Sequence, residues 1–136
     1  MKKLTVNAST ENLSKVLEFI DDELEVLDAS MKMIFLIGLA VEEIYVNIVR
    51  YAYTPNGGKV TIELEHHDEP SQLEIRFIDQ GNPFNSLDNA EPDITLSAEE
   101  REIGGLGILM IKKTMDTVNY TFKNNENRLT IKKIIS

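Results

Sequence analysis

The feature that most constrains this chain is a helix-length stretch, residues 33–49, in which nearly every side chain is apolar or small. Its polar exceptions are Glu42, Glu43, Tyr45 and Asn47. A helix that is apolar on almost all sides is stable only when other protein elements surround it. Its continuous apolar part, residues 33–41, is far shorter than the roughly 20 residues that span a bilayer. The stretch therefore predicts a buried helix over about 31–53, ended by the turn residues 54–58.

The rest of the pattern supplies the layers that could bury this helix. Alternating apolar residues predict five strands, at about 2–8, 59–66, 72–78, 118–123 and 128–134. Helical spacing predicts two further helices, one capped by Ser9 or Thr10 and running to Leu27, the other over roughly 106–116, while Ser30 is the expected N-cap of the buried helix. The simplest architecture is an α+β two-layer sandwich, with a mixed sheet of about five strands covered by three helices. We expect one domain over residues 1–136.

Composition narrows the classes of function. The net charge of −9 disfavours a broad nucleic-acid surface and indicates protein or small-molecule partners. The absence of cysteine excludes disulfides and thiolate chemistry. The N-terminus has no apolar run typical of a signal peptide, so a cytoplasmic location without membrane attachment is expected.

Glu43 and Asn47 are the first candidate site residues. They lie four positions apart and so share a face of the buried helix, with Arg50 about one turn further on. A carboxylate and an amide are costly to bury without partners. One interpretation is that neighbouring backbone groups satisfy both; the other is that Asn47 binds Mg²⁺ through its amide oxygen while Glu43 activates a hydroxyl or water beside it.

The second candidate is Asp79-Gln80-Gly81, directly after an apolar strand. A carboxylate at a strand end can accept a hydrogen bond from the amino group of adenine, whereas guanine would present a carbonyl oxygen there. Gly81 would let a flat ring approach the backbone closely. The alternative is an ordinary tight turn that Asp79 caps.

The third candidate is the run Gly104-Gly105-Leu106-Gly107 at the start of the last predicted helix. Exposed N–H groups at a helix start bind anions such as phosphates, although a flexible loop end would look similar. It follows a long acidic segment, residues 79–103, that is typical of a lid. One nucleotide could meet all three candidates, with its base at Asp79, Mg²⁺ at Asn47 and its phosphates at Gly105 and Gly107.

The two histidines of the chain are also candidate metal ligands. His66 and His67 are adjacent on a predicted strand and so face opposite ways. A metal ion shared by the two is therefore not expected.

The motifs together resemble the GHKL (histidine kinase-like) ATPase superfamily, in particular its anti-sigma-factor serine/threonine kinase branch. Residues 39–53 look like that branch's N-box, 79–84 like its G1 box and 104–108 like its G2 box. The resemblance spans essentially the whole chain. It implies a Bergerat-type sandwich that binds ATP and Mg²⁺ and often dimerises.

The resemblance also implies roles for individual residues. Glu43 matches the general base, Asn47 the Mg²⁺ ligand and Asp79 the reader of adenine. Arg50 falls where a basic residue can approach the phosphates, and Thr130 on the last strand could support the adenine. Arg101, the only cation of the acidic lid, is our candidate for contacting the γ-phosphate.

The expected function is phosphorylation of a serine or threonine on an anti-sigma-antagonist-type protein, combined with binding of a sigma factor or similar regulator. The alternatives are a non-catalytic ATP-binding module that sequesters a partner and a detached histidine-kinase catalytic domain. Tyr51 stands where the branch usually has a histidine, and Ile48 where a smaller residue is commoner. These departures leave the partner open.

Overall fold

The computed structural model describes residues 1–52, 57–85 and 105–136, without the side chains of 51–52 and 105–108. It contains a sheet of five strands, which are β1 (Lys2–Asn7), β2 (Lys59–His67), β3 (Gln72–Asp79), β4 (Thr117–Lys123) and β5 (Glu126–Ile134). The α-helices are α1 (Leu13–Val26), α2 (Met31–Asn47) and α4 (Gly105–Thr114). A 3₁₀ turn at Thr10–Asn12 precedes α1, and a π-helical turn at Ile48–Ala52 continues α2.

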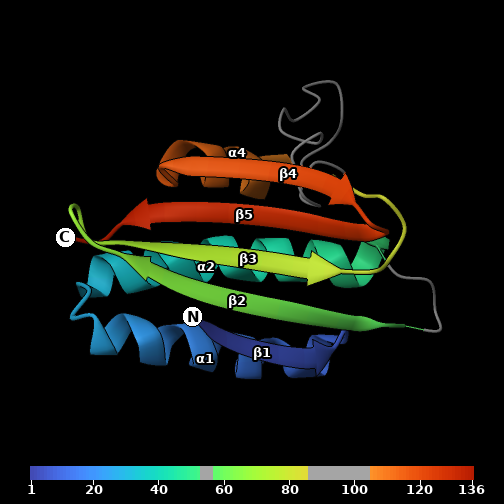
Figure 1. Cartoon of the computed structure of the whole chain (residues 1–136), viewed down its shortest axis with the longest axis horizontal. Coiled ribbons are helices and arrows are strands. Elements are labelled where there is room, and N and C mark those ends of the chain that lie inside the picture. Colours follow the sequence, from blue (N-terminus) through green and yellow to red (C-terminus); the bar gives the residue numbers. More distant parts are fainter. Residues whose placement is uncertain (53–56, 86–104) are drawn as a thin grey trace.

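The helices cover one face of the sheet, while the other face is turned toward the viewer in Figure 1. The predicted α+β two-layer sandwich of five strands and three α-helices is thus confirmed for the described residues. The space between the layers holds the apolar core, to which β2, β3 and β5 contribute Val60, Ile62, Ile75, Phe77 and Leu129, and the helices Val16, Ile20, Leu24, Ile37, Ala40, Ile44 and Ile111. None of the described helices is both long enough and apolar enough to cross a membrane.

The prediction of a mixed sheet was wrong. The strand order is β1-β2-β3-β5-β4, and every neighbouring pair is antiparallel. The connection from β3 through α4 to β4 is of the kind that joins parallel strands. However, β5 lies between β3 and β4, so both contacts become antiparallel and no parallel pair remains.

Local contacts fix the position of α2. The Ser30 hydroxyl accepts a hydrogen bond from the Met33 amide at 3.2 Å, which confirms the expected N-cap. Near the other end, the fully buried Tyr45 donates its hydroxyl to the carbonyl oxygen of Ser9 at 2.6 Å. This bond ties α2 to the chain just after β1. Ser9 itself does not cap α1, which begins only at Leu13.

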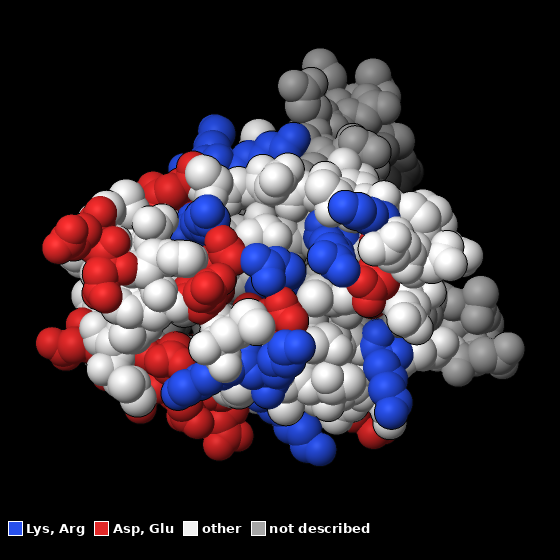
Figure 2. All heavy atoms as spheres, viewed as in Figure 1, with Lys and Arg blue, Asp and Glu red and all other residues white. Residues whose placement is uncertain are grey.

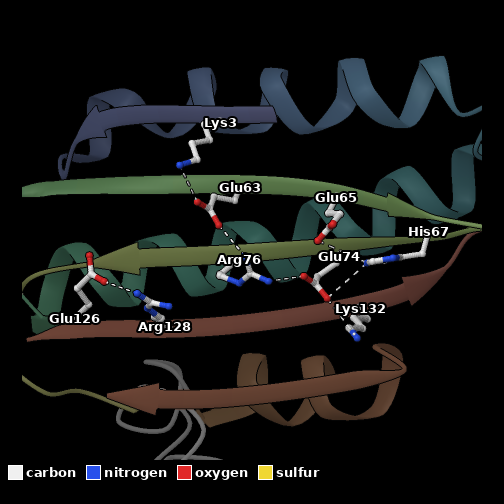
Figure 3. Close-up of polar contacts among 9 residues, drawn as sticks. All are labelled: Lys3, Glu63, Glu65, His67, Glu74, Arg76, Glu126, Arg128 and Lys132. Atoms are coloured by element: carbon white, nitrogen blue, oxygen red, sulfur yellow. Dashed lines mark hydrogen bonds and ion pairs between the residues drawn. The ribbon is translucent and has the colours of Figure 1, made fainter. Parts of the chain in front are cut away.

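The outer face of the sheet carries charges of both signs instead of a second apolar layer. Figure 2 shows Lys and Arg side chains interspersed with Asp and Glu across this face. Figure 3 resolves the middle of it into a row of ion pairs that crosses the strands, Lys3–Glu63–Arg76–Glu74–Lys132. We call this row the charge ladder. The cross-strand pairs in it satisfy one another, so this face needs no covering helix.

Candidate functional site

Three of the predicted motifs lie toward one end of the molecule. In Figure 1 the C-terminal end of α2, the C-terminal end of β3 and the start of α4 are all toward the right of the view. Both α2 and β3 end on this side of the molecule, and α4 begins there. A site assembled from all three elements is therefore compatible with the topology.

Asp79 is the buried carboxylate at the end of β3. Its side chain shares the helix-covered side with Phe77, and the residue is only 3% exposed. Its Oδ1 atom accepts two hydrogen bonds, from the Gly81 amide and from Asn127 Nδ2, each at 2.9 Å. The tight turn that Asp79 caps, which was the alternative interpretation of this motif, is thus present. Among the described residues no donor reaches Oδ2, so this oxygen can still accept a hydrogen bond from a ligand.

Asn127 is a residue that the sequence analysis missed. It is buried on β5, directly opposite Asp79 in the sheet register. Its Nδ2 also donates to the carbonyl oxygen of Asn82 at 2.8 Å, and its Oδ1 accepts from the Phe84 amide at 3.0 Å and the Tyr120 hydroxyl at 2.5 Å. One side chain therefore holds the segment from Asp79 to Phe84 against β5. In the sequence Asn127 falls between the strands expected at 118–123 and 128–134, and only the strand pairing reveals its role.

The described groups that bond to the Asp79 carboxylate are neutral. Burial raises the pKa of this carboxyl, and the hydrogen bonds from Asn127 and Gly81 lower it by less, so the net shift is upward. No described cation forms an ion pair with Asp79 within 4.0 Å. A buried carboxylate with neutral donors on one oxygen and an available second oxygen is suited to a neutral donor such as an amino group.

Glu43 and Asn47 are brought together as their spacing predicted. Asn47 is buried and turns its Nδ2 toward Glu43 Oε1 at 3.4 Å, while Glu43 is half-buried. The amide oxygen of Asn47 accepts no hydrogen bond from a described residue. That leaves an oxygen ligand for a hard cation such as Mg²⁺ beside a carboxylate.

Of the residues predicted to contact the phosphates, the structure places Arg50, Gly105 and Gly107 but does not describe Arg101. Arg50 is exposed in the π-helical turn that follows Asn47, and π-helical turns are frequent at functional sites. Gly105 is the first residue of α4 and Gly107 lies in its first turn, which confirms the expected helix start. Arg101 and most of the predicted lid lie outside the described residues.

Thr130 is not brought to Asp79. On β5 it belongs to the residues that alternate with buried Leu129 and Ile131, so it lies on the outer face of the sheet, opposite Arg76. The position on β5 that meets Asp79 is that of Asn127. Contact of Thr130 with adenine stays a prediction that this placement disfavours.

Two cavities in the described part of the chain differ in which of the predicted site residues line them. A hollow of about 400 Å³ includes Asp79 and Gln80 in its wall, but it opens on the outer face of the sheet, because its lining residues Thr5, Thr61 and Ile78 alternate with the buried residues of their strands. A larger one of about 670 Å³ lies between α1 and α2 and is lined by Phe35 and Glu42, but by neither Glu43 nor Asn47. Size alone would select the second. The chemistry favours the end of the molecule where Asp79 lies, because a recognition site needs convergent polar groups.

Comparison with known protein families gives a match over nearly the whole chain. A family profile described as histidine kinase-like ATPase domain matches residues 6–133. This span includes Glu43, Asn47, Asp79 and the glycine-containing start of α4.

Two curated relatives are named as kinases. The chain is 24% identical over 102 residues to serine/threonine-protein kinase BtrW of Bordetella bronchiseptica, covering 75% of this chain and 71% of that protein. It is 32% identical over 85 residues to serine-protein kinase RsbW of Listeria innocua, covering 59% of this chain and 53% of that protein. The match thus spans about half of the Listeria protein.

Solved structures share the fold at low sequence identity. The RsbU and RsbW domains of Rv1364c from Mycobacterium tuberculosis give a TM-score of 0.62 at 16% identity, covering 98% of this chain and 32% of that one. The SiaB–SiaC complex from Pseudomonas aeruginosa gives 0.59 at 15% identity, covering 97% and 89%. At these identities the likeness concerns the fold.

Proposed function

The chain belongs to the histidine kinase-like ATPase domain family, and from this premise we propose that it is an ATP- and Mg²⁺-dependent protein serine/threonine kinase that acts as an anti-sigma regulatory factor. Its substrate would be a serine or threonine of an anti-sigma-antagonist-type protein. A sigma factor or similar regulator would be its second partner, and a homodimer its working form. The matched span of residues 6–133 supports a single domain over the chain.

The observation that carries ATP recognition is the arrangement at Asp79. Its Oδ1 is held by Gly81 and Asn127 at 2.9 Å, so the carboxylate has a fixed orientation. Its Oδ2 is left to accept a hydrogen bond from the exocyclic amino group of adenine. A guanine base would place a carbonyl oxygen against the same carboxylate, which is repulsive. The nucleotide preference would therefore be for adenine.

The residues of α2 would act on the other end of the nucleotide. The amide oxygen of Asn47 is suited to hold Mg²⁺, which would neutralise charge on the phosphates. Glu43 lies beside it, with Oε1 near the Asn47 amide at 3.4 Å. We assign Glu43 to accepting the proton of the attacking serine or threonine hydroxyl. Arg50 and the N–H groups at the start of α4 would bind phosphate oxygens.

The kinase names of the relatives favour catalysis over nucleotide binding alone. Glu43 provides the test. We expect Glu43→Gln to bind ATP and Mg²⁺ with wild-type affinity, while transfer of the γ-phosphoryl group falls about 100-fold or more. Glu42→Gln is the matched control, since Glu42 is exposed and points about 100° away around the helix.

The experiment has two steps. Partners are first captured from the native host with and without ATP, and each purified candidate is then incubated with the protein and labelled ATP. An acid-stable phosphoprotein that depends on Glu43 supports the proposal, and an acid-labile phosphohistidine would identify a histidine kinase instead. ATP binding without any transfer would favour a non-catalytic module. A wild-type rate in Glu43→Gln would remove Glu43 as the base.

A further inference from the structure

The hairpin end of β2 and β3 carries a cluster of side chains that the proposed kinase does not use. Glu65 and His67 are two residues apart on β2 and so lie on the same, outer face of the sheet. Glu74 is directly opposite Glu65 in the register. Figure 3 shows the three side chains converging above this face. They lie near the start of β3, whereas Asp79 is its last residue.

The three side chains approach one another without forming hydrogen bonds among themselves. His67 Nε2 lies 3.8 Å from Glu65 Oε2 and 3.8 Å from Glu74 Oε1. Both distances are too long for a hydrogen bond. The His67 Nε2 atom is shielded from solvent and has no hydrogen-bond partner among the described residues. A shielded polar atom without a partner is destabilising unless something satisfies it.

A divalent cation would satisfy this nitrogen. The three potential ligand atoms lie within 4.8 Å of one another. A zinc-type ion binds imidazole nitrogen and carboxylate oxygen at about 2.0–2.2 Å, so small side-chain rotations would bring all three atoms into contact with one ion. Two carboxylates would balance its charge, and three protein ligands leave a position for water. Mg²⁺ does not fit, because it prefers oxygen ligands.

The neighbouring cations shape the cluster in two ways. Arg76 binds the other oxygen of Glu74, Oε2, at 2.5 Å and so orients its carboxylate. Lys132 lies 3.3 Å from Glu74 Oε1, the oxygen that faces His67. A metal ion would have to displace the Lys132 ammonium group from that oxygen. The Lys132 side chain is 39% exposed and can turn into solvent.

We propose that Glu65, His67 and Glu74 form a binding site for a zinc-type divalent transition-metal ion on the outer face of the sheet. The site is separate from the proposed nucleotide site and uses no residue of it. Lys132 occupies one ligand oxygen when the metal is absent and lowers the affinity of the site.

The chain has only two histidines, which makes the test direct. We would titrate the nucleotide-free protein with ZnCl₂ and follow the imidazole C–H signals by NMR, with calorimetry for stoichiometry and affinity. We expect the His67 signals to move saturably at one ion per chain, while His66 moves little. His66 is a suitable internal reference, because its Nε2 lies 2.8 Å from the Ser71 hydroxyl. Millimolar Mg²⁺ should not compete.

The variants separate a built site from an adventitious one. His67→Ala and Glu65→Gln should each weaken zinc binding at least 10-fold, and His66→Ala should leave it unchanged. Lys132→Met should strengthen it several-fold, because the competing cation is gone. Thermal unfolding of each variant checks that the fold is intact. Zinc binding that is indifferent to His67→Ala and Glu65→Gln, or weakened by Lys132→Met, would overturn the proposal.

Discussion

The carboxylate of Asp79 and the carboxylates of the charge ladder are all largely removed from solvent, yet their surroundings differ in kind. Asp79 is held by the neutral donors Asn127 and Gly81, and its pKa is raised. Burial alone would also raise the pKa of Glu63, but hydrogen bonds and charges from Arg76 and Lys3 outweigh it and the pKa is lowered. The ladder therefore gains stability from the negative charge of Glu63. The end of β3 keeps a charge that costs stability and remains available to a ligand.

Among these variants, Asn127→Ala should change the free energy of unfolding most. This change removes the four hydrogen bonds that the Asn127 side chain makes with Asp79, Asn82, Phe84 and Tyr120. We expect the free energy of unfolding to fall by about 2–4 kcal/mol, since a typical hydrogen bond contributes roughly 0.5–1.5 kcal/mol and all four are lost together. Urea denaturation measures this change. Asn119→Ala, at an exposed position on β4, is the control and should change it little.

Asp79→Asn tests whether the Asp79 carboxylate recognises ATP, because it keeps the hydrogen bonds that Oδ1 accepts within the fold. The asparagine keeps the Oδ1 acceptor for Gly81 and Asn127 and replaces Oδ2 with a donor. We expect ATP affinity in the presence of Mg²⁺ to fall by about 10–100-fold, which corresponds to losing a hydrogen bond to a charged group. Calorimetric titration measures it, with Asp68→Asn at an exposed turn as control. Undiminished ATP affinity would show that Asp79 does not contact the base.

Arg76→Met tests whether the charge ladder contributes to stability without contributing to ATP binding. Arg76 holds Glu63 at 2.7 Å and Glu74 at 2.5 Å, and its side chain is 28% exposed. We expect a loss of about 1–2 kcal/mol in unfolding free energy, between the values for exposed and buried ion pairs, with ATP affinity unchanged. Arg128→Met removes a single pair, with Glu126, and should cost less. A loss of ATP affinity in Arg76→Met would contradict the separation of the two regions.

The smallest effect is a difference in pH dependence. Because the folded-state pKa of Asp79 is raised above 3.8, its ionisation destabilises the fold as pH rises through that pKa. Asp79→Asn should therefore gain stability relative to wild type as pH rises from about 4 to 7. Because the pKa of Glu63 is lowered below 4.5, its contribution is present above that pH and lost as pH falls through the folded-state pKa. Glu63→Gln should be less stable than wild type near neutral pH and equal to it in acid.

Chemical denaturation at a series of pH values measures both variants. Opposite signs for the two near neutral pH are the expected outcome. The same sign for both would mean that the surroundings of Asp79 and Glu63 do not differ as the structure indicates.

Local patterns in the sequence were enough to predict most of the helices and strands and to bring one pair of site residues together. The apolar stretch around residues 33–49 predicted the helix α2 correctly, although only one side of it is buried and Phe35 is 65% exposed. The four-residue spacing correctly placed Glu43 beside Asn47. The glycine run gave the start of α4, and the turn at Asp79 followed from its residue types. These features depend on contacts between residues a few positions apart, which helix and turn geometry alone determine.

What only the tertiary structure decided is the pairing of distant segments. The insertion of β5 between β3 and β4 made the sheet antiparallel throughout, and the same register placed Asn127 against Asp79 and turned Thr130 to the outer face. The register also brought Glu74 to Glu65 and His67. A shift of one residue along a strand moves every side chain to the other face without altering the strand's own pattern of alternation. The sequence therefore determined which residues could form the sites, and the packing of the whole sheet determined which of them meet.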